Sequence, residues 1–529
     1  MHKKRKIFRI LYNINKAVGG DFIKIATSSM IKNIDDFAEN HLHIPITVLM
    51  GRSGEAAASA VRNLLAPGGN IVFLCGCGNN GGDGYAAATK LISEYNVTVF
   101  DVFEKGQKSE SGRYWRAEYI NSGGKIVMGI PTQDYISQSV DLVVDAIFGT
   151  GFSGEVPKNL IALSNYINEE EKLKVCAIDI PLGVCADDGS VESFALRSDV
   201  TVALSFPKVA MYSYPAKEYV GEVVVDDLGI QHEAIAKKFT FNDWLIDLSL
   251  ASSIIPKRYD NSNKGSFGKS LLIVGSDRFM GAAALAFEGA LRGGAGYVSF
   301  LGTDELCTFL LNKFPEGIYN RTLLSDTEKI LSMCERQDAV LIGCGVECNE
   351  NIYKIISNLV ETDGAPLIID ADGINSISKF GSSNILKRAK RKIILTPHPL
   401  EFSRLTGLSV DYIQANRYRV AKEFAAEYGC VLLLKGAGTV ITDGLNTFVN
   451  GSGSSALAKA GSGDVLAGLL VSILAYFKSP LESAALAAFI HGRAGDLLSS
   501  EFSNYGVIPS DIPQMAAKVF LELEKNNGL

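Results

Sequence analysis

The chain alternates short apolar runs with helix-length segments of mixed polarity over two long stretches. The first stretch extends from Asn70 to Val225, and its expected strands are NIVFLCG, VTVFDVF, KIVMGI, DLVVDAIF, KVCAIDI, VTVALSF and GEVVVDD. Strands separated by helix-length segments are typical of βαβ units, which predicts a parallel sheet. Ahead of this stretch, residues 24–65 carry apolar residues at helical spacing.

A second series with the same rhythm follows the segment KRYDNSNKGSFG. Its expected strands are KSLLIVGS, GYVSFLG, DAVLIGCG, PLIIDADG, KIILTPH, CVLLLKG and TVITDG, and a long helical tail closes the chain. The charged segment from Leu228 to Pro256 has neither rhythm, so we expect the domain boundary there. We predict two tandem α/β domains, at 24–235 and 236–529, behind a basic N-terminal extension at 1–23.

Composition narrows the class of protein. The 529 residues are 47% hydrophobic and include 52 glycines, which is typical of compact α/β enzymes. The net charge of −7 gives no basic footprint for nucleic acid, and no uninterrupted apolar stretch is long enough to span a bilayer. Nine cysteines without zinc-site spacing indicate reduced thiols. We therefore predict a cytoplasmic protein with neither nucleic-acid nor membrane partners.

The segment LAKAGSGDVLAGLL carries the stronger chemical signal. Gly461, Ser462 and Gly463 lead directly into an apolar helix, so their backbone N–H groups can converge on an anion at its positive end. Asp464 is then placed to take a proton from a hydroxyl that attacks a phosphate. The alternative is an ordinary helix start with the aspartate as its cap.

Two further segments favour a phosphate-handling site. LLLKGAGTVI places Lys435 and a glycine-rich turn between two strands, where a nucleotide's phosphate or ribose could bind. LTPHPLEFSRLTG places His398 between two prolines at the end of a strand, and the carboxyl ends of parallel strands are where ligands bind. A lone histidine, by contrast, is more often structural.

Six segments of the second half resemble NAD(P)H-hydrate dehydratases of the ribokinase-like fold, in the same order, over residues 257–496. They are NKGSFGKSLLIVGS, MGAAALAFEGALRGGAGYVSF, IDADGIN, TPHPLEFSRLTG, LLLKGAGTVITDG and AGSGDVLAGLL. The resemblance implies phosphorylation of the C6 hydroxyl of hydrated NAD(P)H by ADP or ATP, followed by loss of phosphate. It also implies that Asp464 is the base.

The same resemblance implies two sets of contacts. The hydrate would lie along Ala282, Gly345, His398 and Asp464, and the nucleotide along Lys435, Gly436, Ala437, Gly438, Thr439 and Gly463. The chain departs from the family pattern at two positions. Asn263 stands where the family has a histidine before KG, and Leu400 replaces a glycine. Both positions flank the expected site and leave its base in place.

In the first half, CGCGNNGGDGYA follows an apolar strand and fits the G-x-G-x-x-G fingerprint of dinucleotide binding. A dehydrogenase would use Asp101 on the ribose, but no hydride-transfer partner is evident. Asn79 and Asn80 can bind a ligand or cation, or can simply form a turn. Asp145 with Thr150, and Asp179, also follow strands, so we expect Asn80, Asp145 and Asp179 to converge at one edge of the sheet.

These motifs, with SSMIKNIDDFAENHLHIPITVLM before them, resemble the NAD(P)H-hydrate epimerase domain over residues 24–230. The resemblance implies interconversion of the R and S hydrates, with Asp179 as the acid/base and potassium held by Asn80 and Asp145. It implies hydrate contacts from Asn79, Asn80, Gly81, Gly82, Asp83, Gly149, Thr150, Gly151, Phe152, Ser153, Gly154 and Glu155. Departures are LMGRSG in place of L-M-E-N-A-G, and Leu182 in place of a serine that binds potassium.

Taken together, the chain is expected to be a bifunctional repair enzyme, with a Rossmann-like and then a ribokinase-like three-layer sandwich. Its expected small molecules are hydrated NADH and NADPH, with ADP as phosphoryl donor, ATP as the other possible donor, and Mg²⁺ and potassium as cations. We also expect a homo-oligomer. Two alternatives stay open at this point: a ribokinase-like vitamin or sugar kinase, and a first half retained only for binding.

Overall fold

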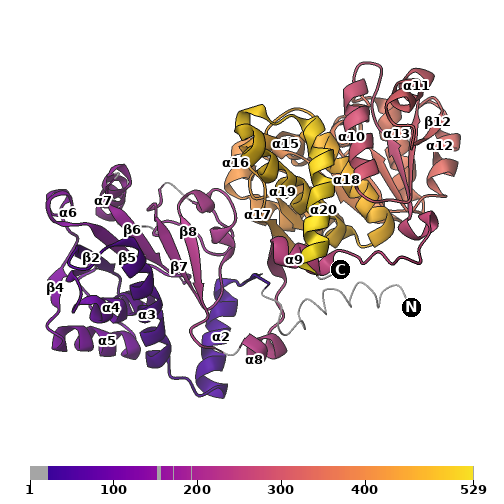
Figure 1. The fold of residues 1–529 in the computed structure, drawn as a ribbon. Coiled ribbons are helices and arrows are strands. Elements are labelled where there is room, and N and C mark those ends of the chain that lie inside the picture. The colour runs from indigo at the N-terminus through magenta and orange to yellow at the C-terminus, as the bar shows by residue number, and fades with distance from the viewer. Residues whose placement is uncertain (1–21, 152–155, 171, 192–193, 231, 528–529) are drawn as a thin grey trace. The chain divides into compact units, whose positions relative to one another are not determined.

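The computed structural model describes residues 22–151, 156–170, 172–191, 194–230 and 232–527. Its internal contacts divide the chain between Phe241 and Asn242 into two compact units, shown in Figure 1. We call Lys24–Phe241 the first unit and the part from Asn242 onward the second unit. Among the described residues, no helix combines the length and apolarity that crossing a membrane requires.

The first unit is a parallel sheet with helices between its strands. Its elements are β1 (Lys24–Ile25), α2 (Ser28–His41), α3 (Ile46–Leu64), β2 (Asn70–Cys75), α4 (Asn79–Leu91), β3 (Asn96–Asp101), α5 (Glu110–Asn121), β4 (Lys125–Met128), α6 (Gln133–Ser139), β5 (Leu142–Ala146), α7 (Lys158–Glu169), β6 (Lys174–Ile178), β7 (Val200–Leu204), β8 (Glu222–Asp226) and α8 (His232–Lys238). Short 3₁₀ helices occupy Val209–Met211 and Ala216–Glu218.

Strand order in this sheet is β4-β3-β2-β5-β6-β7-β8, and every pairing is parallel. The order reverses at β2, because β3 lies on one side of it and β5 on the other. Strand β5 is buried along its whole length, as expected for a strand covered on both faces. Ligands of open parallel sheets bind where the order reverses, so the loops after β2 and β5 mark the expected site.

The second unit is larger and also α/β. It comprises β9 (Asp243–Ile246), α9 (Leu248–Ile254), β10 (Lys269–Ile273), α10 (Met280–Arg292), β11 (Tyr297–Gly302), α11 (Asp304–Lys313), β12 (Ile318–Arg321), α12 (Thr327–Cys334), β13 (Ala339–Ile342), α13 (Glu350–Glu361), β14 (Leu367–Ile369), α14 (Ala371–Phe380), β15 (Ile393–Leu395), α15 (Pro399–Thr406), α16 (Val410–Ala415), α17 (Arg417–Tyr428), β16 (Val431–Leu434), β17 (Val440–Thr442), β18 (Thr447–Asn450), α18 (Ser462–Phe477), α19 (Pro480–Gly506) and α20 (Ile512–Asn526). Short 3₁₀ helices occupy Lys264–Phe267, Ser383–Arg388, Ser455–Leu457 and Pro509–Asp511.

The sheet of the second unit runs β9-β18-β17-β16-β15-β14-β13-β10-β11-β12. Only β17 is antiparallel to its neighbours in this order. Helix α18 packs against α10 and α19. Glycines allow the close approach of α10 to α18, because a β-carbon at Gly468 would lie 1.9 Å from the carbonyl oxygen of Ala286. This packing fixes the N-terminus of α18, where the GSGD segment lies.

The predicted fold class, two tandem α/β domains with parallel sheets, is confirmed, and so are the strands expected from the two apolar series. The segment Leu228–Pro256, which has neither rhythm in the sequence, contains α8, β9 and α9, and β9 was not among the expected strands. Strands β12 and β18 were not expected either. These three strands are four residues long, and their sequences DWLI, IYNR and TFVN mix polar with apolar residues. Pairing with neighbouring strands, rather than local pattern, makes them strands: β12 pairs with β11, and β18 pairs with β17 and β9.

Candidate functional sites

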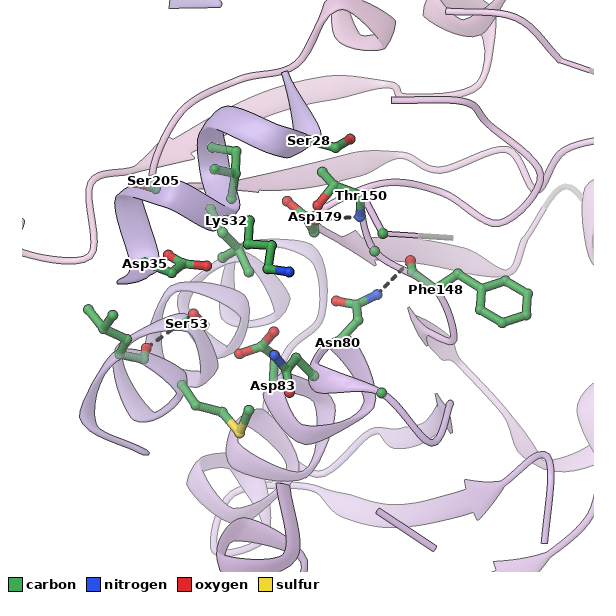
Figure 2. Close-up of a pocket in the computed structure, with 18 of the residues that line it drawn as sticks. Ser28, Lys32, Asp35, Ser53, Asn80, Asp83, Phe148, Thr150, Asp179 and Ser205 are labelled. Atoms are coloured by element: carbon green, nitrogen blue, oxygen red, sulfur yellow. Dashed lines mark hydrogen bonds between the residues drawn. The ribbon is translucent and has the colours of Figure 1, made fainter. Parts of the chain in front are cut away.

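A cavity of about 740 Å³ opens in the first unit at the point where the strand order reverses. Figure 2 shows carboxylate and amide side chains gathered around it. Its size lies within the range of small-molecule and cofactor sites. Seven residues singled out from the sequence line it: Asn79, Asn80, Asp83, Gly149, Thr150, Gly151 and Asp179. The loops after β2, β5 and β6 therefore do meet at one edge of the sheet.

Two glycines of the GNNGGDG segment have a packing role. A β-carbon at Gly81 would lie 1.9 Å from the carbonyl oxygen of Gly76, and one at Gly82 would lie 2.6 Å from the sulfur of Met50. Both positions therefore admit only glycine without a shift of their neighbours. The predicted contacts Phe152, Ser153, Gly154 and Glu155 lie outside the described residues.

Asn80 and Asp145 have different surroundings. The amide nitrogen of Asn80 donates to the carbonyl oxygen of Phe148 at 2.7 Å, while its Oδ1 is buried without a hydrogen-bond partner among the described residues. Asp145 is fully buried, and its two oxygens accept the backbone N–H groups of Ile147 and Leu182 at 3.1 and 2.6 Å. Burial raises the pKa of Asp145 to about 6. An unpaired amide oxygen and a buried carboxyl group are both oxygen donors of the kind that suit a cation.

Asp179 is held in a strained backbone conformation, with a positive φ of 69°. Its Oδ2 accepts the N–H of Thr150 at 3.1 Å, and its Oδ1 accepts a short hydrogen bond from the ammonium group of Lys208. The Lys208 side chain is completely buried and also donates to the carbonyl oxygen of Leu204 at 3.0 Å. A β-carbon at Gly149 would lie 3.0 Å from the Asp179 carboxylate and 3.4 Å from the Asn80 side chain, so these two side chains flank the same glycine.

Sequence analysis missed Asp35 and Ser53, which line this cavity, and Lys208, which pairs with Asp179 from behind the lining. Asp35 comes from α2 and lines the cavity, and its pKa is raised to about 6 by burial, against the opposing charge of Lys208. The pKa of Asp83 is raised well above its ordinary value by burial and then by the charges of Asp179 and Asp35. Lys208 could have been found from its position in the sequence, because it follows the carboxyl end of strand β7.

The dehydrogenase alternative required Asp101 as a ribose ligand. That carboxylate is fully buried, and its Oδ2 accepts the backbone N–H of Gly106 at 3.1 Å. It is therefore occupied in shaping the loop after β3.

In the second unit, the GSGD segment begins α18 as predicted. Gly461 is the N-cap residue, in a left-handed conformation, and Asp464 lies in the first turn rather than at the cap. The buried His491 of α19 donates from Nε2 to the carbonyl oxygen of Ser462 at 3.0 Å. Burial lowers the pKa of His491 to about 4, so the ring is neutral and anchors this turn.

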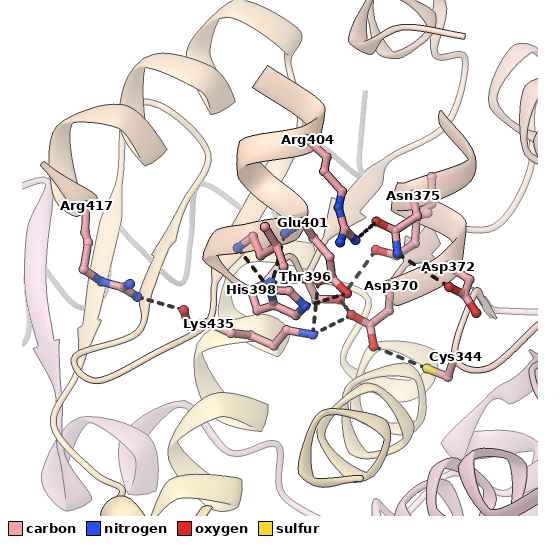
Figure 3. Close-up of polar contacts among 12 residues, drawn as sticks. Cys344, Asp370, Asp372, Asn375, Thr396, His398, Glu401, Arg404, Arg417 and Lys435 are labelled. Atoms are coloured by element: carbon pink, nitrogen blue, oxygen red, sulfur yellow. Dashed lines mark hydrogen bonds and ion pairs between the residues drawn. The ribbon is translucent and has the colours of Figure 1, made fainter. Parts of the chain in front are cut away.

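Asp464 belongs to a cluster with Cys344 and Asp370, whose ligand atoms all lie within 4.8 Å of one another. Figure 3 shows how Lys435 approaches Asp370, with Nζ 2.7 Å from Oδ1. Burial raises the pKa of Asp464 to about 7; the charge of Asp370 adds to the rise, and Lys435 opposes it. A group that is half-ionised near neutral pH suits general-base catalysis.

Lys435 lies among acids. Burial by itself lowers its pKa, but the carboxylates of Asp370 and Glu401 outweigh this effect and raise it. Its Nζ is 3.9 Å from Glu401 Oε2, and a β-carbon at Gly463 would lie 3.4 Å from the same nitrogen. The ammonium group therefore lies between Asp370 and the N-terminus of α18. The structure thus brings Lys435, Gly463 and Asp464 together.

Arg417 holds the backbone at the start of the glycine-rich turn after β16. This buried guanidinium donates to the carbonyl oxygens of Leu434 and Lys435 at 3.0 and 2.9 Å. Gly436 has a positive φ of 143°, and a β-carbon there would lie 2.7 Å from the Arg417 side chain, so the position requires glycine. The remaining residues expected to contact nucleotide, Ala437, Gly438 and Thr439, form the solvent-accessible part of the turn.

His398 caps α15. Its Nδ1 accepts the backbone N–H groups of Leu400 and Glu401 at 3.1 and 3.3 Å, and its backbone N–H donates to Glu401 Oε2 at 2.8 Å. Burial and then the charge of Lys435 lower the pKa of His398. Burial raises the pKa of Glu401 to about 7, although Lys435 opposes the rise. The histidine is thus a structural cap, and its ring also lies beside the Lys435 cluster (Figure 3).

Gly345 and Ala282 meet beyond β13, because a β-carbon on Gly345 would lie 2.9 Å from that of Ala282.

Among the departures from the family pattern, Asn263 accepts the N–H of Gly265 at 2.9 Å and caps a 3₁₀ helix, and Leu400 is 45% exposed. Leu182 is 1% exposed and packs in the apolar core of the first unit. The Leu182 side chain makes van der Waals contacts with this core, whereas a serine side chain at the same position would provide an oxygen atom.

Comparison with known proteins covers both units. The family described as NAD(P)H-hydrate dehydratase matches residues 270–518, and the family described as YjeF-related protein N-terminus matches residues 46–210. The bifunctional NAD(P)H-hydrate repair enzyme Nnr of Moorella thermoacetica is 31% identical over 523 residues, which cover 95% of this chain and 97% of that protein. Its Escherichia coli namesake is 32% identical and covers 90% of each chain.

Among solved structures, the ADP/ATP-dependent NAD(P)H-hydrate dehydratase of Bacillus subtilis, co-crystallised with ATP and Mg²⁺, is 30% identical to this chain. The alignment covers 53% of this chain and 98% of that one, with a TM-score of 0.48.

Proposed function

Because the chain belongs to the family of bifunctional NAD(P)H-hydrate repair enzymes, we propose that it repairs hydrated NADH and NADPH in two steps. The first unit interconverts the R and S hydrates, and the second returns the S form to the reduced dinucleotide. The observation that carries the second activity is Asp464, a carboxyl group with a pKa raised to about 7 at the N-terminus of an apolar helix. The two family matches, one in each half, favour this function over a kinase with a binding module.

In the second unit we assign the proton-accepting role to Asp464. It takes the proton of the C6 hydroxyl, whose oxygen then attacks the terminal phosphorus of the nucleotide and displaces the shorter nucleotide. The N–H groups of Gly463 and Asp464 at the start of α18 and the Lys435 ammonium offset the negative charge on the transferred phosphoryl group. Loss of phosphate from C6 and of a proton from C5 then restores the ring double bond.

The remaining contacts in the second unit are assigned by position. Gly463 and the Lys435–Thr439 turn hold the nucleotide, because they adjoin the same helix N-terminus. Ala282, Gly345 and His398 lie along the hydrate. ADP is the proposed donor, with ATP as the other candidate. Mg²⁺ would enter with the phosphates and take a carboxylate ligand from Asp370, since Asp464 is the base and the Cys344 thiol is a poor ligand for this ion.

In the first unit we propose that Asp179 acts on the reacting carbon and that the cavity-lining loops hold the dinucleotide. Potassium would be held by Asn80 and Asp145. The buried, unpaired Oδ1 of Asn80 supports this assignment, whereas Leu182 contributes no oxygen to it. A bound cation would neutralise the carboxylate of Asp145 and anchor the loops after β2 and β5. A cytoplasmic location and a homo-oligomeric state stay predictions from the sequence.

The test is recovery of reduced-nicotinamide absorbance from resolved S and R hydrates, each with ADP or ATP. Wild type is compared with Asp464→Asn, and with Asp411→Asn as a matched exposed control. We expect recovery from S that disappears only in Asp464→Asn, and faster recovery from R than its spontaneous epimerisation allows. A stable phosphorylated product without absorbance recovery would instead identify a kinase.

A further inference from the structure

Three carboxylates from three different elements line the cavity of the first unit. Asp35 comes from α2, Asp83 from α4, and Asp179 from the loop after β6. Figure 2 shows them around the space into which the Lys32 side chain also reaches. The buried ammonium of Lys208 forms its ion pair with Asp179. The three carboxylates therefore share one cavity, and the Lys208 ion pair balances the charge of Asp179.

The hydrogen bonds of Asp179 are those of a carboxylate that accepts. Both of its oxygens accept hydrogen bonds, from the Lys208 ammonium and from the N–H of Thr150, which is how an ionised carboxylate is satisfied. Its strained backbone and its buried partner fix the position of the carboxylate. This arrangement supplies a base, but an epimerase that acts on both hydrates also needs a proton donor.

Asp83 has the opposite surroundings. The residue is buried, at 8% exposure, and its pKa is raised by this burial and then by the charges of Asp179 and Asp35. Lys208 and the Ser53 hydroxyl oppose this rise without reversing it. Lys32 and Lys108 are the other charged groups that line the cavity. A carboxyl group that is buried beside two carboxylates retains its proton, and so it can donate.

Building on the proposed epimerase function, we propose that Asp83 is the second catalytic residue of this site, the acid that works opposite the Asp179 base. The pairing follows the pattern in which the surroundings of two carboxyl groups in one site give them different protonation states. Lys208 acts through Asp179 as a positioning residue.

Asp83 gives its proton to the C6 hydroxyl, the C6–O bond breaks, and water leaves with the electron pair while the ring nitrogen lone pair forms a C=N bond. A water molecule attacks the other face of C6, the C=N electrons return to nitrogen, and Asp179 takes the proton of the attacking water. The product is the other epimer, and one water has replaced another. Proton exchange with solvent resets the two carboxyl groups.

The experiment uses the full chain carrying Asp464→Asn, so that the second unit does not consume the hydrate. Conversion of the R to the S hydrate is followed by chromatography against pH, and hydrate affinity is measured separately. Asp83→Asn, which is isosteric and has no carboxyl proton, is compared with Asp35→Asn and with Asp36→Asn, an exposed neighbour outside the cavity lining. Thermal unfolding of each variant checks that it is folded.

We expect Asp83→Asn to lower kcat by roughly 10²- to 10⁴-fold, to leave hydrate affinity nearly unchanged, and to abolish the fall in rate at alkaline pH. In water enriched in heavy oxygen, the epimerised product should carry the label. The assignment is overturned if Asp83→Asn keeps its rate, if it loses rate and affinity together, if the product keeps its original oxygen, or if only Asp35→Asn removes the alkaline limb. If the parent chain itself fails to epimerise, the proposed function fails, and this result is distinct from a defect confined to Asp83→Asn.

Discussion

Replacing Asp464 by asparagine should stabilise the second unit at alkaline pH while it removes dehydratase activity. The folded state raises the pKa of Asp464 from 3.8 to about 7, first by burial and then through Asp370. Since one pKa unit corresponds to about 1.4 kcal/mol, ionising this group costs the folded state ~4 kcal/mol at most. The side chain is partly accessible to solvent, so we expect ~2 to ~4 kcal/mol.

The sign of the effect follows from proton binding. Below about pH 4 the folded and unfolded states both hold the proton, and the substitution leaves the pH-dependent term unchanged. Between about pH 4 and pH 7 only the folded state holds it, so the wild type loses stability relative to Asp464→Asn as pH rises. Above about pH 7 the difference is constant and largest.

The chain offers a clean assay because each unit contains one of its two tryptophans, Trp115 in the first and Trp244 in the second. Trp244 is fully buried in β9 and stacks on Phe448. In a Trp115→Phe background, urea unfolding followed by fluorescence therefore reports the second unit alone. The comparison at acidic and alkaline pH is made with Asp411→Asn as the exposed control.

The activity of the same variant supplies an independent check. Wild-type turnover should rise with pH through about 7 as Asp464 ionises, and Asp464→Asn should lose roughly 10²- to 10⁴-fold. The reasoning is refuted if Asp464→Asn is no more stable than wild type at alkaline pH, or if the stability difference between them is the same at acidic and alkaline pH.

Four further substitutions, one of them a control, test the packing and charges around the two sites. Lys435→Met removes the ion-pair partner of Asp370, whose side chain is only 2% exposed. Urea unfolding at neutral pH should therefore show a loss of about 3 to 5 kcal/mol in the free energy of unfolding, and a loss below about 1 kcal/mol would contradict the role of the pair. Gly468→Ala should lower the free energy of unfolding by about 1 to 3 kcal/mol or more, because the new β-carbon would lie 1.9 Å from a carbonyl oxygen. Gly281→Ala is the control: no atom lies within 4 Å of its β-carbon, and the helix should gain about 0.5 to 1 kcal/mol of stability. Leu182→Ser should cost about 2 to 4 kcal/mol in NaCl, and part of this should return in KCl if the hydroxyl joins a potassium site; equal melting in both salts would exclude that site.

Local pattern determined the main elements of this fold. The apolar runs from NIVFLC to EVVVD became the strands of the first sheet. Its inner strands are buried on both faces and need continuous apolar side chains, whereas the edge strands β4 and β8 are more exposed. The same rule located β10, β11 and β13 to β17. It failed at β9, β12 and β18, whose short mixed sequences become strands because neighbouring strands satisfy their backbone groups.

The sites divide in a similar way. The sequence by itself determined that a GSGD segment would begin an apolar helix and that GNNGGDG would follow a strand, because helix starts and tight turns depend on neighbouring residues. Only the tertiary structure decided that Lys208 pairs with Asp179, that Lys435 pairs with Asp370, and that Asp83 and Asp464 have raised pKa values. Burial and Coulomb interactions depend on distances between elements far apart in the chain, and no local pattern contains those distances.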